Sequence, residues 1–522
     1  MRVVLVTMDS HLASAAERAR VDLARRLPGA SLVVHAASEW GDDEAALARC
    51  RADIGAAHIV LVTMLFMEEH FLPVIDALRA RRDGCDAMVC AMCAGEVMKL
   101  TRMGRFSMDG QASGMAALLK KLRSRMSGKG ETEGAAKASA GAQQMKMLRR
   151  LPQILRFIPG TAQDMRAYFL VLQYWLAGSQ ENLLSLVHLL IDRYAAGERA
   201  SLRGRAKVAP PAEYPEVGLY HPRMAGRLSA DLAALPRVAT SGRDGTVGLL
   251  LLRSYLLAGN TAHYDGVITA LEARGLRVRP AFATGLDARP AVDAYFVGPD
   301  GRPTVDAVVS LTGFSLVGGP AYNDSQAAEE VLARLDVPYL SVMPVEFQTL
   351  EQWGDSERGL LPVEATMMVA IPELDGSTGP MVYGGRSETA GQACHGCARG
   401  CRFEPTADGQ HLHDMQTCSE RADALAARVQ KLVALRRGER ARRKVACVIF
   451  NFPPNAGNTG TAAFLSVFES LFHTLSAMKQ AGYAVDLPVS PDALREAVIH
   501  GNAERFGAAA NVHARIGVDD HV

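Results

Sequence analysis

Short apolar runs alternate with amphipathic stretches through the first hundred residues of the chain. The runs lie at residues 3–7, 31–35, 58–64 and 87–90. Stretches between them, such as residues 12–26 and 68–81, have the apolar spacing of helices. Continuous apolar runs are typical of parallel strands that are covered on both faces. The alternation therefore predicts a doubly wound α/β sheet.

The pattern changes several times along the 522 residues, a length that exceeds what one hydrophobic core usually supports. Residues 127–142 lack any large apolar side chain, which is typical of a linker. We predict a multidomain α/β protein, with parallel doubly wound sheet domains and an intervening helical region. The predicted divisions are an amino-terminal α/β domain at 1–126, a linker at 127–144, a helical region at 145–240, a second α/β domain at 241–415, and the start of a further, truncated α/β domain at 416–522.

Charge and apolar content exclude several classes of protein. The 57 basic and 56 acidic residues nearly cancel, so the chain has no field that would draw it to nucleic acid. The most apolar stretch, residues 167–178, is too short for the roughly 20 apolar residues of a transmembrane segment. The amino terminus lacks the parts of a signal peptide. We expect a cytoplasmic protein, with its nine cysteines reduced.

A loop at residues 451–461 lies between a predicted strand, residues 445–452, and a predicted helix, residues 462–480. Free N–H groups at a helix start favour an anion such as a carboxylate or phosphate. The loop has no Walker lysine, which argues against an ATP site. A tight turn capped by a threonine explains the same residues. The candidate anion-binding residues are Asn451, Asn455, Asn458 and Thr459.

Three ionisable residues in the second predicted sheet domain are candidates for catalysis. His263 lies one turn into a helix predicted at residues 261–274, where an imidazole could accept a proton or bind a metal. Glu346 and Glu364 lie among strand-like segments and are candidates for oxygen ligands in a cleft. An ordinary hydrogen-bonded histidine and solvated carboxylates are the competing interpretations. Asn323 follows a glycine pair at 318–319, where the backbone approaches a ligand or another strand.

Three cysteines follow one another closely in a C-x2-C-x3-C arrangement, and a fourth lies nearby. Thiolates at this spacing suggest an iron–sulfur cluster, with zinc as the second choice. A glycine-rich loop of free thiols is the alternative. Cys85, Cys90 and Cys93 fall in or beside an apolar run, which favours core packing. The candidate metal ligands are Cys394, Cys397, Cys401 and Cys418.

Several of these segments, taken in order, resemble one known family. The matching runs are residues 99–106, 174–178, 257–264, 310–324, 344–353 and 451–463. They are similar to the large, porphyrin-binding subunits of magnesium chelatase, more than to the related cobalt chelatase subunits. Chains of that family continue well beyond this point, into a glycine-rich segment with a glutamate associated with the active site. The resemblance therefore implies an amino-terminal portion.

The resemblance implies a function in (bacterio)chlorophyll synthesis. In that family the large chain binds protoporphyrin IX while Mg²⁺ is inserted, and two smaller subunits, including an AAA+ ATPase, use ATP to drive the reaction. In this context His263, Glu346 and Glu364 are expected to accept pyrrole protons, and the asparagines with Thr459 to anchor the porphyrin. A truncated paralogue that only binds porphyrin or the partner subunits is a second hypothesis. An iron–sulfur redox protein is a third.

Overall fold

The computed structural model divides into two compact units, Met1–Gln430 and Lys431–Val522. Within the described residues, no helix is both long enough and apolar enough to span a membrane. The linker predicted at residues 127–144 lies outside the described part of the chain. The structure describes residues 1–8, 12–37, 40, 43–108, 151–237, 245–319, 322–387, 397–402, 414–452, 456–502, 505 and 514–521.

The amino-terminal sheet has the strand order β2-β1-β3-β4-β5-β6. Its first four strands are parallel, and the two short strands at one edge are antiparallel. The predicted α/β alternation is confirmed, and each apolar run became a strand. The bounds are β1 (Arg2–Thr7), β2 (Ser31–Ala36), β3 (Ile59–Thr63), β4 (Ala87–Ala91), β5 (Arg102–Met103) and β6 (Phe106–Ser107).

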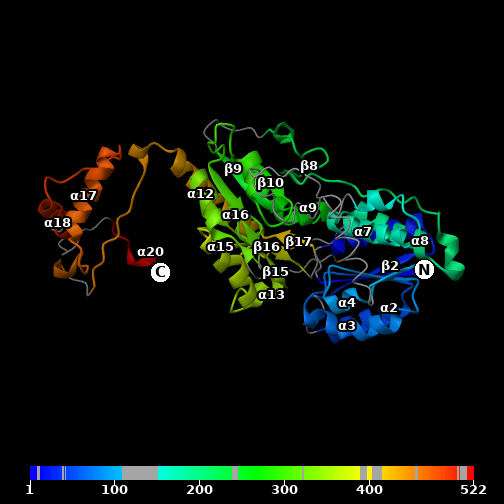
Figure 1. Ribbon diagram of the computed structural model, residues 1–522. Coiled ribbons are helices and arrows are strands. Elements are labelled where there is room, and N and C mark those ends of the chain that lie inside the picture. The colour runs from blue at the N-terminus through cyan, green and yellow to red at the C-terminus, as the bar shows by residue number, and fades with distance from the viewer. Residues whose placement is uncertain are drawn as a thin grey trace. The chain divides into compact units, whose positions relative to one another are not determined.

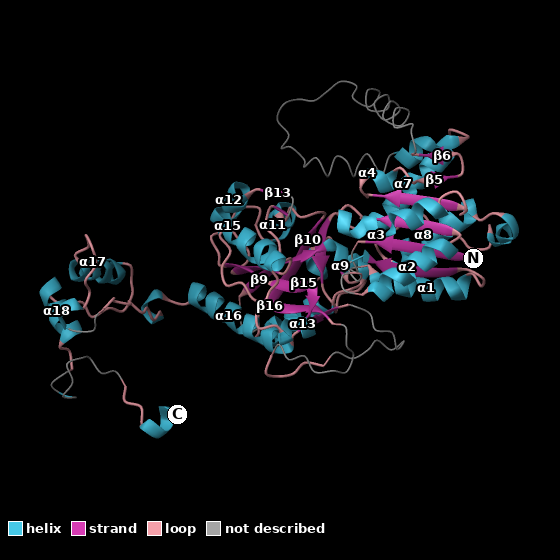
Figure 2. Cartoon of the chain, turned by 90° about the horizontal axis from the view of Figure 1, so that it is seen from below, coloured by secondary structure: helices cyan, strands magenta, loops and turns pink. Residues whose placement is uncertain are grey.

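Helices cover both faces of this sheet, as Figure 2 shows. On one face α2 (Glu44–Ala56) and α3 (Glu68–Arg81) bury Ile54 and Phe71 against the strands. On the other face α1 (Ala13–Arg26) packs with α7 (Thr161–Ala177) and α8 (Gln180–Tyr194). The helices of the predicted helical region thus complete the core of the amino-terminal sheet. The short α4 (Gly95–Met98) and a 3-10 turn at Gly197–Leu202 also belong to this part.

A second sheet has the order β14-β11-β9-β10-β7-β8, and β9 and β10 lie side by side in Figure 1. Its four strands β14, β11, β9 and β10 are parallel, whereas β7 and β8 run antiparallel at one edge. The strands are β7 (Val217–Tyr220), β8 (Leu228–Ser229), β9 (Thr246–Leu252), β10 (Arg277–Ala283), β11 (Ala307–Ser310) and β14 (Tyr339–Ser341). The helices are α9 (Arg253–Ala258), α10 (Ala262–Ala273), α11 (Arg289–Tyr295), α12 (Ser325–Leu335) and a 3-10 turn at Leu232–Ala234.

A small sheet of β15, β16 and β17 follows, and α10 packs against β17. The helical segment after β15 contains a π-helix at Ala365–Ala370, a rare form that is frequent at functional sites. The remaining elements of this unit are β12 (Gly318–Gly319), β13 (Tyr322–Asn323), β15 (Met343–Thr349), α13 (Leu350–Asp355), α14 (Pro362–Glu364), α15 (Ile371–Leu374), β16 (Val382–Arg386), β17 (Met415–Thr417) and α16 (Ser419–Arg437), which runs into the second unit.

The second unit contains helices, and one prediction about it was wrong. Residues 445–452 were expected to form a buried strand, but they form none, and Val448 is 95% exposed. A parallel strand exists only where a neighbouring strand takes its hydrogen bonds, and no strand is described in residues 431–522. The described α-helices of this unit are α17 (Val467–Gln480), α18 (Pro491–Ile499) and α20 (Val518–His521). Two 3-10 turns lie at Arg440–Arg442 and Ala456–Asn458.

Candidate functional site

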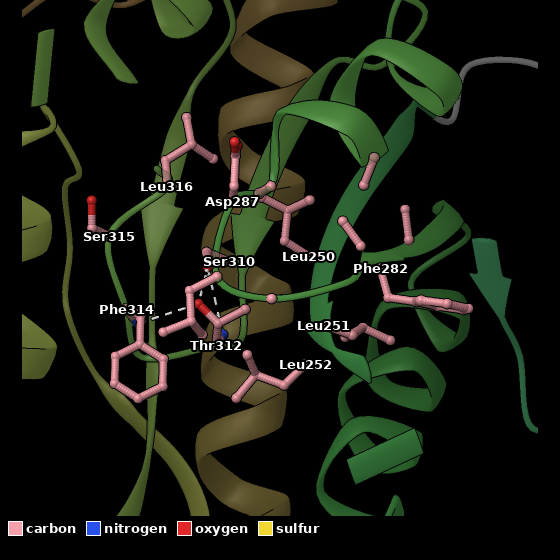
Figure 3. Close-up of a pocket in the computed structure, with 16 residues that line it drawn as sticks. Leu250, Leu251, Leu252, Phe282, Asp287, Ser310, Thr312, Phe314, Ser315 and Leu316 are labelled. Carbon is pink, nitrogen blue, oxygen red and sulfur yellow. Dashed lines mark hydrogen bonds between the residues drawn. The ribbon is translucent and has the colours of Figure 1, made fainter. Parts of the chain in front are cut away.

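A pocket lies at the carboxyl ends of β9, β10 and β11 in the second sheet (Figure 3). The chain passes from β9 to β10 on one side and then returns to β11 on the other side of β9. Open α/β sheets bind ligands at such a switch point. Leucines from β9, Phe282 and Phe314 line much of the pocket. Its cavity of about 20 Å³ has room for roughly one water molecule, so the side chains fill most of it.

One wall of this pocket is polar. The Ser310 and Thr312 hydroxyls lie 2.9 Å apart, and Thr312 Oγ1 accepts a hydrogen bond from Phe314 N at 3.2 Å. Behind the wall, Asp375 Oδ2 accepts hydrogen bonds from Ser315 Oγ at 2.6 Å and Leu316 N at 2.8 Å. Burial raises the pKa of the Asp375 carboxyl. Asp375 therefore holds the loop that closes the pocket.

His263 lies inside an aromatic cluster and is fully buried. Its ring centre is 5.2 Å from that of Tyr255 and 6.1 Å from that of Tyr383, which stacks nearly parallel to it. Neither ring nitrogen has a hydrogen-bond partner among the described residues. Burial lowers the pKa of His263 to about 3, so the imidazole is neutral at neutral pH.

Acid is expected to destabilise the protein through His263. The pKa of this group is 6.5 in the unfolded chain and about 3 in the fold, so between pH 6.5 and pH 3 mainly the unfolded chain binds the proton. Stability is therefore full above that pH and is lost as the pH falls, by about 2 kcal/mol between pH 7 and pH 5. Urea unfolding of the wild type and of His263→Phe at both pH values measures this loss. An equal loss in the variant would assign the pH dependence to other groups.

The two candidate glutamates have different surroundings. Glu346, on β15, is half-buried. Burial is the main cause of the raised pKa of Tyr264 and of Tyr383, and the negative charge of Glu346 raises both further. The charge of Glu346 thus acts on two tyrosines of the aromatic cluster that contains His263. Glu364 is fully buried and accepts hydrogen bonds from Phe347 N at 3.3 Å, from Leu361 N at 3.1 Å and from the Gln348 amide. These bonds fix the start of the π-helical segment.

Three of the four candidate metal-binding cysteines meet at one place. The Sγ atoms of Cys397 and Cys401 lie 3.7 Å apart, and those of Cys401 and Cys418 lie 4.0 Å apart. Cys418 comes from the junction of β17 and α16, whereas the other two come from the preceding loop. Burial raises the pKa of Cys401, but hydrogen bonds from Ser419 and the neighbouring thiols lower it below its ordinary value. Cys394 lies outside the described residues.

The candidate porphyrin anchors do not form one group. Asn323 belongs to β13 in the first unit and pairs with Gly318. Asn451 is exposed in the second unit, and Asn458 and Thr459 are half-buried there. Asn455 lies outside the described residues. Their role remains a prediction. Sequence reasoning did not name Ser310, Thr312 or Ser315 as site residues, although Ser310 lies within a strand predicted at residues 307–311 and the other two follow it.

Comparison with known proteins gave consistent matches. Residues 172–521 match the family described as CobN/Magnesium Chelatase, and residues 2–169 match a domain family of unknown function. The large (H-type) magnesium-chelatase chain of Cereibacter sphaeroides is 50% identical over 99% of this chain and 42% of its own length. The corresponding chain of Rhodobacter capsulatus is 48% identical over 98% of this chain and 41% of its own length. The chain thus spans about two fifths of these relatives.

More distant matches include cobalt chelatases. The aerobic cobaltochelatase protein CobN of Pseudomonas aeruginosa is 30% identical over 56% of this chain and 21% of its own length. The solved catalytic subunit of cobaltochelatase from Mycobacterium tuberculosis has a TM-score of 0.52 and 19% identity, covering 96% of this chain and 33% of that chain. At this identity the structural likeness concerns the fold.

Proposed function

The chain belongs to the CobN/magnesium chelatase family, and from that premise we propose that it provides the porphyrin-holding part of a magnesium chelatase. The observation that carries the proposal is the 50% identity to the large magnesium-chelatase chain of Cereibacter sphaeroides over 99% of this chain. The substrates would be protoporphyrin IX and Mg²⁺, in (bacterio)chlorophyll synthesis. Two smaller subunits, one of them an AAA+ ATPase, would use ATP. A cytoplasmic location is part of the same proposal.

Magnesium insertion requires that the ion lose water, which it does reluctantly, and that two pyrrole protons leave. Proton acceptors and a site that excludes water would lower both barriers. Among the predicted acceptors, His263 is neutral, but a pKa of about 3 makes the buried imidazole a weak base. The charge of Glu346 acts on Tyr264 and Tyr383 of the same aromatic cluster. Because His263 is fully buried, a pyrrole would reach it only after the packing of Tyr255 and Tyr383 opens.

A fluorescence titration with protoporphyrin IX tests the proposal, followed by a chelation assay with the two partner subunits, ATP and Mg²⁺. Saturable binding with turnover supports a working part of the chelatase. Binding without turnover supports the second hypothesis, a module that holds porphyrin or occupies the partner subunits. The absence of binding would contradict both. A corrin ligand in the same titration tests the cobalt alternative, which the lower identity of 30% to CobN disfavours.

We also propose that Cys397, Cys401 and Cys418 bind a metal through their thiolates. All three sulfur atoms lie within 4.8 Å of one another. The Zn–S bond of about 2.3 Å implies sulfur atoms roughly 3.8 Å apart around a tetrahedral ion, close to the 3.7 and 4.0 Å found here. The donor set therefore fits zinc. An iron–sulfur cluster uses the same thiolates, and Cys394 would supply the fourth ligand in either case.

Replacing Cys401 is expected to abolish metal binding, because its Sγ lies 3.7 Å from that of Cys397 and 4.0 Å from that of Cys418, so its loss removes one of the three clustered ligands. Protein purified without oxygen is examined by metal analysis and visible absorbance. A zinc site would give about one zinc ion per chain and no visible absorbance. An iron–sulfur cluster would give iron and sulfide in the metal analysis and absorption bands in the visible range. Cys401→Ser should lose the metal, while Cys447→Ser, which alters an exposed thiol outside the cluster, should keep it. Wild-type protein that holds neither metal would contradict the proposal.

A further inference from the structure

A groove of about 420 Å³ lies at the amino-terminal ends of β9 and β10, at the edge of the sheet opposite the switch-point pocket. We call it the arginine groove. It is formed by the start of these strands and by the segment around the 3-10 turn at Leu232–Ala234. Its volume is within the range of ligand pockets. The lining residues are Leu232, Leu235, Pro236, Arg237, Thr246, Arg277, Val278 and Arg279.

The charged residues described in this lining are all arginines. Arg237 and Arg277 are exposed, and neither has an ion pair within the described residues. Arg279 is held in place, because its Nη1 donates hydrogen bonds to Tyr295 O at 3.0 Å and Thr304 Oγ1 at 2.6 Å. Burial lowers the pKa of Arg279, and the positive charge of Arg277 lowers it further. An anion between these guanidinium groups would relieve that repulsion.

The remainder of the lining is mainly apolar. Leu232 is 41% exposed, Leu235 and Pro236 are half-buried, and Val278 is buried. Beside them, the buried Thr246 also lines the groove, and its N–H donates to Asp306 Oδ2 at 2.8 Å. A ligand that suits this groove has a flat or compact apolar body and more than one anionic group. Arginine is well matched to such a ligand, because its planar fork binds carboxylates bidentately and stacks on aromatic faces.

We infer that the arginine groove is a holding site for a porphyrin dicarboxylate, with Arg237 and Arg277 on the two propionates and the macrocycle against Leu232, Leu235 and Pro236. The inference rests on the proposed function for the identity of the ligand. The seven residues of β10 span roughly 23 Å. A macrocycle in this groove would therefore lie at the other end of the sheet from the carboxyl edge, so holding and proton removal would occur at different places.

The test compares the full chain with Arg237→Gln/Arg277→Gln in a fluorescence titration with protoporphyrin IX and with its dimethyl ester. Each guanidinium that is lost should weaken binding about tenfold, so the double variant should raise the Kd of the dicarboxylate about a hundredfold. The ester lacks the charges and should bind wild type and variant equally. Arg203→Gln/Arg205→Gln removes the same charge from exposed positions elsewhere and should bind like wild type. Thermal melts check that both variants fold.

The outcomes separate the two proposals. If wild type and Arg237→Gln/Arg277→Gln bind the dicarboxylate with equal affinity, the groove is not the site, although the chain still binds porphyrin. If the control variant loses as much affinity as the groove variant, general charge and not the groove determines binding, which also overturns the inference. If wild type binds neither the acid nor the ester, the proposed function itself fails.

Discussion

Gly384→Ala is expected to lower the free energy of unfolding of the first unit by about 3 kcal/mol, the upper part of the usual range for overpacking. Gly384 lies in β16, beside the backbone of β17. A Cβ at this position would overlap the carbonyl oxygen of Gln416 and lie 3.3 Å from Thr417 Cα. Both obstacles are backbone atoms, so no side-chain rotation relieves the clash, and β17 must move away from β16.

That movement would also change the candidate sites. The Thr417 hydroxyl shares its single proton between the carbonyl oxygens of Ala262, at 2.6 Å, and His263, at 3.0 Å, so β17 holds the start of α10. Cys418 follows directly and is one of the three clustered thiols. We therefore expect Gly384→Ala to weaken metal binding at the cysteines together with stability.

Urea unfolding followed by far-ultraviolet circular dichroism measures the change in stability. Gly55→Ala is the matched control, because Gly55 lies in α2, and a Cβ there meets nothing within 4 Å. Alanine in a helix interior is more favourable than glycine by about 0.5–1 kcal/mol, so the control should be slightly more stable than wild type. A Gly384→Ala protein as stable as wild type would show that β16 and β17 are not packed this closely.

Glu364→Ala is expected to cost about 3–5 kcal/mol of stability, because it leaves the N–H groups of Phe347 and Leu361 without their acceptor and removes one of the two acceptors of the Gln348 amide. The Leu361 N–H and the Gln348 amide reach the same oxygen, Oε2. All three donors come from segments that precede the π-helical turn: Phe347 and Gln348 lie in β15, and Leu361 directly precedes α14. The local structure from β15 to α15 should therefore loosen as a unit, and calorimetry or urea unfolding would detect the loss.

Glu364→Gln separates a structural role from the predicted catalytic one. Glutamine keeps one acceptor oxygen, so the variant should lose less stability than Glu364→Ala. Under conditions in which the variant is folded, it should keep its activity. A catalytic carboxylate would instead lose turnover in Glu364→Gln at unchanged melting temperature. Glu373→Ala is the control, since Glu373 is exposed in α15 of the same helical segment and should change neither quantity. Equal losses in Glu364→Ala and Glu373→Ala would contradict the capping role.

The candidate site was only partly predictable. The close spacing of Cys397 and Cys401 along the chain made their proximity foreseeable, and Cys418 was included because it follows soon after. The burial of His263 was not foreseeable, because Tyr383 lies far along the chain and stacks on the imidazole only in the folded molecule. The same holds for the arginine groove, in which Arg237 comes from one segment and Arg277 from a strand that follows two helices.

Sequence alone determined the four parallel strands of the amino-terminal sheet, but not its two short antiparallel strands, β5 and β6. Residues 3–7, 31–35, 58–64 and 87–90 were predicted, and β1, β2, β3 and β4 lie within one or two residues of them. Such strands can be predicted from the sequence because a strand that is buried on both faces is a continuous run of apolar, often β-branched residues, and this composition is a local property of the chain. Residues 445–452 have similar composition but form no strand in the structure. A strand forms only where a neighbouring strand can pair with it. The burial of His263, the meeting of the three cysteines and the arginine groove each depend on contacts between segments that are distant in the sequence. The tertiary structure alone therefore decided these features.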